Sequence, residues 1–171
     1  MIIKEKQLTN SKDPKVRAGE DAEKQMAFYL QRSFAKEKDC FVLNDLRIVH
    51  EGNTAQIDHL IVTQFGLFII ESKCVSEYGK ITVNERDEWS RTYHNEIKGM
   101  PSPVLQSEAQ GVILKELLRA NAESLLGQIL FGTLQKGFKF CPILTYVAIS
   151  DTGIIDREKE VLSLYKADQI T

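Results

Sequence analysis

The segment QIDHLIVTQFGLFIIESKC, residues 56 to 74, decides the fold. Its two apolar runs predict two buried strands joined by a turn at Phe65-Gly66. Four ionisable residues interrupt the runs, namely Asp58, His59, Glu71 and Lys73. Burying an unpaired charge costs several kcal/mol. These four positions therefore need a structural or a chemical reason.

The elements around this hairpin predict one layered domain. Helical spacing of apolar residues runs from Lys15 to about Lys38 and again from Pro103 to about Asn121. We expect strands at 40–50, 80–84, 89–94 and 141–150, a loop at 95–102, and a short strand with the start of another element in 161–171. The order of helix, several strands, helix and strand predicts an α/β or α+β fold, in which helices flank a central mixed β-sheet.

The length of 171 residues fits a single domain. We expect residues 1–14 to form a polar N-terminal arm, either loose or a short edge strand, and residues 15–171 to form the domain. The end at Ile170-Thr171 carries no stop signal, which suggests a piece of a longer protein. No stretch has the ~20 apolar residues of a membrane span or the apolar block of a signal peptide. We therefore expect a cytoplasmic protein with no membrane partner.

The charge and the cysteine content argue against several classes of protein. The formal net charge is −2, so a nucleic acid would have to be bound locally and not through a broad basic face. Cys40, Cys74 and Cys141 are odd in number and form no C-x-x-C pair, which argues against a disulfide framework and a zinc site. We expect all three to be buried as small apolar residues.

Strand geometry predicts that the ionisable residues gather. Glu71 and Lys73 are two apart, so they project from the same face of a strand, and a folded-back partner strand can bring Asp58 beside them. Glu20 or Glu23 of the first helix can join this group. Clustered carboxylates repel one another unless a cation neutralises them. Mg²⁺ or Mn²⁺ suits such hard oxygen ligands, and a lysine next to the metal can orient an attacking water.

The spacing of these residues resembles the D…(D/E)-x-K signature of the PD-(D/E)XK nucleases, with Asp58 followed by Glu71-Ser72-Lys73. A longer set of motifs resembles the nuclease-related domain (NERD) family. These are Gly19-Glu20, Gln56-Ile57-Asp58-His59-Leu60, Gly66 to Lys73, Gly79-Lys80-Ile81, Trp89 and Pro103-Val104-Leu105-Gln106. One departure is Ser102-Pro103, where the family usually has Asn-Pro.

The resemblance implies a restriction-endonuclease-like core with a catalytic metal. The metal ligands would be Asp58, Glu71 and the backbone carbonyl of Ser72, and Lys73 would position the water. Gln106 and a glutamate of the first helix would complete the site. The Gly-Glu pair assigns that role to Glu20, although Glu23 lies nearer the centre of the apolar face.

Two functions remain open from the sequence. The first is a metal-dependent nuclease that hydrolyses phosphodiester bonds of nucleic acid, DNA rather than RNA, with an added domain or partner protein to assist binding. The second is a non-catalytic module that keeps the nuclease fold and binds nucleic acid or protein. In that case Asp58, Glu71 and Lys73 would form a structural ion pair. His59 should point away from Asp58 and form hydrogen bonds instead of binding a metal.

Overall fold

The computed structural model covers residues 1–171 and describes all of them except 8, 10, 76–78, 127, 130–133 and 136. The described strands of the large sheet are β1 (Ile2–Lys4), β2 (Cys40–His50), β3 (Asn53–Thr63), β4 (Gly66–Lys73), β10 (Ile143–Ile149) and β12 (Leu164–Lys166). They lie in the order β1-β2-β3-β4-β10-β12. The pairs β2–β3 and β3–β4 are antiparallel, whereas β1–β2, β4–β10 and β10–β12 are parallel. The predicted central mixed sheet is confirmed.

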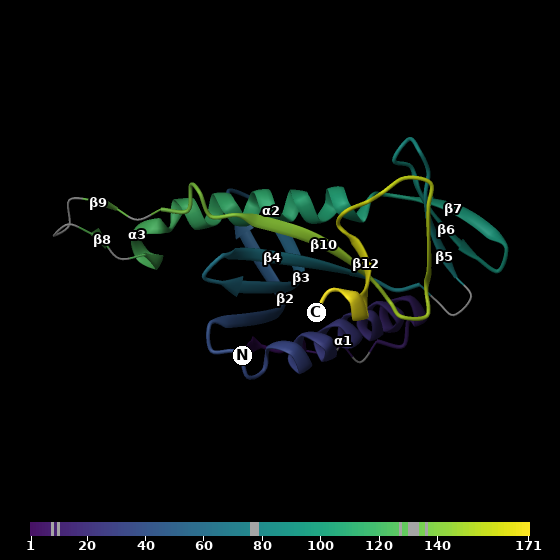
Figure 1. Cartoon of the computed structure of the whole chain (residues 1–171), viewed down its shortest axis with the longest axis horizontal. Coiled ribbons are helices and arrows are strands. Elements are labelled where there is room, and N and C mark those ends of the chain that lie inside the picture. Colours follow the sequence, from purple (N-terminus) through teal and green to yellow (C-terminus); the bar gives the residue numbers. More distant parts are fainter. Residues whose placement is uncertain (8, 10, 76–78, 127, 130–133, 136) are drawn as a thin grey trace.

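Two long helices cover the opposite faces of this sheet (Figure 1). Helix α1 (Pro14–Phe34) packs Met26 and Leu30 against one face, and α2 (Pro103–Ala120) packs Leu114 against the other. The expected start of α2 is confirmed, because the Ser102 side chain accepts a hydrogen bond from the backbone N–H of Leu105 and proline occupies the first turn. No helix in the described part of the chain is long and apolar enough to cross a membrane.

A smaller four-stranded sheet lies beside one end of the large sheet, where α1 and α2 both begin (Figure 1). Its strands are β5 (Lys80–Val83), β6 (Trp89–Tyr93), β7 (Glu96–Met100) and β11 (Ile154–Arg157), in the order β11-β5-β6-β7. A shared apolar cluster that includes Val83 and Trp89 of the small sheet and Ile149 of the large sheet joins the two. At the other end of the molecule, α3 (Ala122–Leu125) leads to the short pair β8 (Gln128–Ile129) and β9 (Leu134–Gln135).

The prediction of a loop at residues 95–102 is wrong, because Glu96–Met100 forms strand β7. The turn that joins it to β6 consists of His94 and Asn95, whose φ angles are 46° and 62°. Two consecutive positive φ angles are typical of a type I′ hairpin turn, which usually contains Asn-Gly or Asp-Gly. His-Asn is an uncommon pair for this turn, and the hairpin was therefore not recognised in the sequence.

Both ends of the chain contribute to the large sheet. Of the two forms expected for the N-terminal arm, the edge strand is present, since β1 pairs with β2. The expected short strand near the C-terminus is β12, followed by a 3₁₀ turn at Ala167–Gln169. All three cysteines are free, as expected, but only Cys40 is buried, whereas Cys74 is exposed and Cys141 is half-buried.

Gly66 is the first residue of β4, directly after the turn of the central hairpin, and its φ is 147°. A Cβ atom at this position would lie 2.6 Å from Cγ and 2.7 Å from the backbone oxygen of Pro142. We expect Gly66→Ala to lower the free energy of unfolding by about 2–4 kcal/mol, since the backbone conformation and the contact both oppose a side chain. Urea unfolding would measure this loss. Gly99→Ala is the matched control, because nothing lies within 4 Å of its added Cβ, and an equal loss in both variants would contradict the explanation.

Candidate metal centre

The site begins where strands β3 and β4 separate. Their ladder ends at the pair His59–Ile70, one residue before Asp58 would pair with Glu71. The Asp58 side chain replaces the missing backbone partner, because its Oδ2 accepts a hydrogen bond of 2.8 Å from the N–H of Ser72. The N–H and C=O of one strand residue point to the same edge. The Ser72 carbonyl therefore faces the same side of β4 as Asp58.

Glu71 and Lys73 project from one face of β4, as predicted. The Lys73 Nζ lies 2.5 Å from Oε1 of Glu71 and 3.2 Å from Oε1 of Gln106, which comes from the first turns of α2. Glu71 is buried, whereas Lys73 is half-buried. The structure therefore brings together Asp58, Glu71, Ser72, Lys73 and Gln106.

Gln110 is a further residue of the site that the sequence analysis missed. It is buried one helical turn after Gln106, and its Nε2 donates a hydrogen bond of 3.0 Å to Oε2 of Glu71. Its own Oε1 is buried without a hydrogen-bond partner in the described part of the chain. The signal available in the sequence was the spacing of four residues from Gln106, which places both amides on one helix face.

His59 lies behind the site and is not a ligand candidate, as expected. It is buried, with Nδ1 2.8 Å from Oδ1 of Asn44 and Nε2 3.1 Å from Oγ of Ser72. Burial, together with the nearby charge of Lys6, lowers the pKa of His59 to about 3. The imidazole is therefore neutral. Through its hydrogen bond to the Ser72 side chain it fixes the residue whose backbone N–H binds Asp58.

The two helix glutamates take different positions. Glu23 lines the cavity described below and forms an ion pair with Lys6. Glu20, which the Gly-Glu motif favoured, does not line that cavity among the described residues. Its Oε1 instead accepts hydrogen bonds from the side chain and backbone of Thr9, at 2.7 and 2.8 Å, and these bonds lower the pKa of Glu20. The arm at residues 1–14 thus binds both glutamates.

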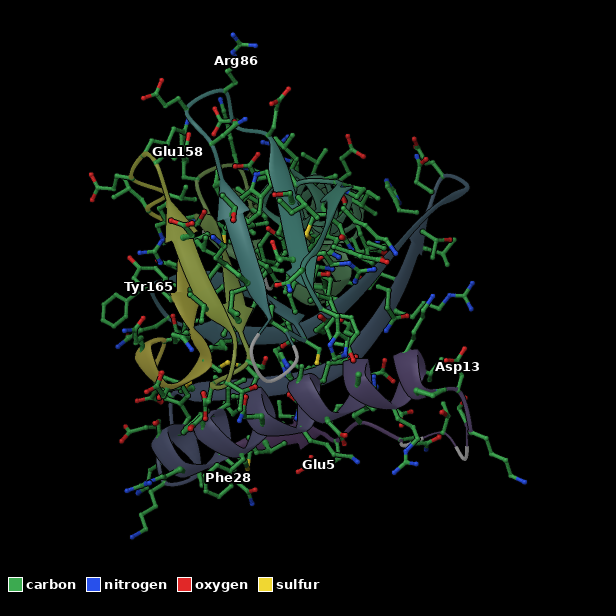
Figure 2. The ribbon with its side chains drawn as sticks, turned by 90° about the vertical axis from the view of Figure 1, so that its right-hand side faces the viewer. Glu5, Asp13, Phe28, Arg86, Glu158 and Tyr165 are labelled. Atoms are coloured by element: carbon green, nitrogen blue, oxygen red, sulfur yellow. The ribbon has the colours of Figure 1, made fainter. Side chains whose placement is uncertain are left out.

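A cavity of about 690 Å³ opens above the carboxylates. Its floor contains Asp58, Glu71 and Lys73. The first turns of α1, from Pro14 to Gly19, line the cavity as well, and so does the β6–β7 hairpin. Asp13, which caps α1, is labelled at the start of that helix in Figure 2. The site is therefore formed by the large sheet, the small sheet and the beginning of both long helices.

The oxygen donors of the site fit a hard divalent cation that keeps several waters among its ligands. Among the described residues, no three Asp, Glu, His or Cys side chains lie close enough together to hold a metal by themselves. Asp58, Glu71 and the Ser72 carbonyl are oxygen donors of the kind that Mg²⁺ takes together with several waters. The residues present therefore fit Mg²⁺ or Mn²⁺ and do not fit Zn²⁺.

The pKa of Asp58 lies well above the ordinary range of an aspartate. Burial, followed by the negative charge of Glu71, raises the pKa of Asp58 to about 8. The folded protein thus binds this proton more tightly than the unfolded chain does. The stability that results is complete below about pH 4, the ordinary range of Asp, and is lost as the pH rises through about 8.

We expect Asp58→Asn to be more stable than the wild-type chain without metal at high pH, and the difference to grow between about pH 5 and about pH 8. The asparagine oxygen can still accept the Ser72 N–H, while no buried charge forms. The expected rise in Tm near pH 8 is on the order of 5 °C. Thermal unfolding in EDTA across this range would measure it, and a Tm difference that is independent of pH would contradict the assigned pKa.

Comparison with known proteins gives one match. The family model described as nuclease-related domain (NERD) matches residues 18–150. No curated protein and no solved structure matches the chain significantly. The matched range contains Asp58, Glu71, Lys73, Gln106 and Gln110, and it excludes the N-terminal arm that binds Glu20 and Glu23.

Proposed function

The chain belongs to the nuclease-related domain family, and from this premise we propose that it is a metal-dependent nuclease that hydrolyses phosphodiester bonds of nucleic acid, with DNA as the preferred substrate. One observation carries the proposal. A lysine ammonium and two carboxylates, on Lys73, Glu71 and Asp58, share the floor of an open cavity at the end of buried strands. Two neighbouring carboxylates repel each other, and one ammonium neutralises only one of them, so a bound cation would stabilise the second.

Asp58, Glu71 and the Ser72 carbonyl would hold Mg²⁺ or Mn²⁺. Both oxygens of Glu71 already accept a hydrogen bond, one from Lys73 and one from Gln110. Each carboxylate oxygen has a second lone-pair site, so these bonds fix the orientation of Glu71 without excluding a cation. When bound, the metal would lower the pKa of a water and stabilise negative charge on a phosphoryl oxygen.

Lys73 and Gln106 would act on the water and the phosphate. The ammonium has three donors, and two of them point at Glu71 and Gln106. The third can donate to an attacking water or to a phosphate oxygen. Gln106 limits the positions that Lys73 can take, because it holds the ammonium from the side of α2.

Positive charge around the cavity supports binding of a phosphate chain. The beginning of α1 lines the cavity, and the start of a helix carries a partial positive charge. Lys15 in the same turn adds a full charge. These groups give local attraction for a polyanion in a chain whose net charge is −2.

The test is cleavage by the purified chain. Labelled single-stranded and double-stranded DNA and RNA should be incubated with the protein in Mn²⁺, in Mg²⁺ and in EDTA. We expect cleavage in either metal and none in EDTA. If none of the four substrates is cleaved in either metal, the nuclease function is rejected.

The second candidate, a non-catalytic binding module with the nuclease fold, is favoured by a separate observation. Among the described residues no third acidic side chain reaches Asp58 and Glu71 closely enough to complete a protein-only metal shell. In this case the chain would bind nucleic acid without any cleavage. The same incubation, combined with a binding measurement in EDTA, separates the two functions.

A further inference from the structure

The β6–β7 hairpin, residues 89–100, lines the cavity that also contains the carboxylates. In its antiparallel register Trp89 pairs with Met100, Arg91 with Lys98 and Tyr93 with Glu96. All of these except Trp89 line the cavity. Because alternate strand residues share a face, the three pairs form a continuous row from the base of the hairpin to its tip.

This row is held firmly at its base. Trp89 is 6% exposed and lies in the apolar cluster that joins the two sheets, with Met100 packed against that cluster. The tip closes in the two-residue turn at His94 and Asn95, which keeps the two strands in register. The middle and outer pairs are therefore presented over the cavity by a preorganised support.

The middle pair places two cations next to each other. Arg91 and Lys98 are directly opposite, an arrangement that destabilises an antiparallel pair. Lys98 lies 3.0 Å from Glu96, but both side chains are exposed, so that ion pair is weak and easily exchanged. Within the described part of the chain, no carboxylate forms an ion pair with Arg91. The pair therefore suits an anion that approaches from the cavity.

The outer pair adds an aromatic surface. Tyr93 is 54% exposed, and its ring contacts His94 edge to face, with ring centroids 4.1 Å apart. An exposed ring can stack on a nucleic acid base. In a duplex both faces of an internal base are covered by its neighbours, so only an unpaired base can use Tyr93. The combination of phosphate-binding cations and a stacking ring is typical of single-strand binding.

We propose that the β6–β7 hairpin binds a single-stranded segment of nucleic acid, with phosphates against Arg91 and Lys98 and a base stacked on Tyr93. The strand then passes over Asp58, Glu71 and Lys73 between the hairpin and α1. That this segment is cleaved there rests on the proposed function. The binding itself does not require cleavage.

The experiment measures binding of the full chain in EDTA, where no metal supports cleavage. The probes are a fluorescein-labelled oligothymidylate of about 12 nucleotides and a duplex of the same length, followed by fluorescence anisotropy. We expect the single strand to bind at least about tenfold more tightly than the duplex. Arg91→Ala should weaken single-strand binding by about tenfold and reduce the slope of log K against log salt by about 0.7.

Matched variants isolate each contact. Arg86 is an exposed arginine in the loop between β5 and β6, at the end of the small sheet far from α1 (Figure 2), so Arg86→Ala should leave the affinity and the salt slope close to those of the wild-type chain. Tyr93→Ala should lose about 5- to 100-fold in affinity, whereas Tyr93→Phe should retain it, since the ring is kept. Circular dichroism checks that each variant is folded.

The outcomes separate this inference from the proposed nuclease function. Equal affinity for duplex and single strand, no binding of either probe, or equal losses in Arg91→Ala and Arg86→Ala would overturn the inference. If the binding pattern holds but the wild-type chain cleaves nothing in Mn²⁺, the inference stands and the nuclease function is rejected. If the chain cleaves DNA while the Arg91 and Tyr93 variants bind like the wild type, the nuclease function stands and the inference about the hairpin is rejected.

Discussion

Lys73→Met should lower the rate of phosphodiester cleavage by about 10²–10⁴-fold while leaving the fold and metal binding intact. Methionine keeps most of the apolar stem and removes only the ammonium that lies 2.5 Å from Glu71. With that cation gone, Glu71 should bind Mn²⁺ at least as well as in the wild-type chain. Single-turnover cleavage of labelled DNA measures the loss, and the rise in Tm with Mn²⁺ measures metal binding.

The matched control for this variant is Lys80→Met. Lys80 also forms an ion pair, with Asp156 at 2.8 Å, but it does not line the cavity. Its replacement should leave the cleavage rate within a fewfold of wild type. If Lys73→Met cleaves DNA as fast as Lys80→Met, Lys73 takes no part in the reaction.

Glu71→Gln should weaken metal binding by on the order of 10² or more and lower cleavage together with it, because a neutral amide is a poorer ligand for a hard cation. The substitution is compatible with the surrounding hydrogen bonds. The oxygen of the new glutamine can accept a hydrogen bond from Lys73. The side-chain amide of Gln110 can rotate by half a turn, so that its unpaired Oε1 accepts a hydrogen bond from the new NH₂ group. Titration of Mn²⁺ against Tm, together with single-turnover cleavage, gives both effects.

Glu23→Gln is the informative comparison. Glu23 is also a cavity carboxylate paired with a lysine, Lys6, and within the described part of the chain no hydrogen bond joins it to Glu71 or Asp58. We expect this variant to keep the Mn²⁺-dependent rise in Tm. A Glu71→Gln protein that keeps the full rise would remove Glu71 from the metal ligands.

Much of the fold was predictable because the hydrophobic pattern is strong where the elements are long. The central hairpin and both long helices carry clear periodicity, and their types were all predicted correctly. The predicted turn at Phe65-Gly66 was one residue late, since Gly66 is the first residue of β4. Strand β7 was missed because four of its five residues are exposed and one is glycine, so it has no apolar alternation.

The part of the site that lies on one hairpin could also be predicted. A spacing of two residues fixes Glu71 and Lys73 on the same face of β4, and their contact follows from strand geometry alone. The choice between Glu20 and Glu23 could not be made in this way. It depends on the N-terminal arm, where Thr9 binds one glutamate and Lys6 the other, and no periodicity in the sequence predicts those contacts. Glu23→Gln tests one of the two, since loss of the Mn²⁺-dependent rise in Tm in that variant would assign Glu23 to the metal.

The short strands at the sheet edges have a consequence for solubility at high concentration. Each edge of the large sheet is a strand of only three residues, β1 with Lys4 and β12 with Lys166. The edges of the small sheet carry charges as well, Lys98 on β7 and Arg157 on β11. Unpaired strand edges are templates for intermolecular pairing and amyloid growth, and short length and charged side chains oppose both. The edges of both sheets thus offer little unpaired backbone for aggregation.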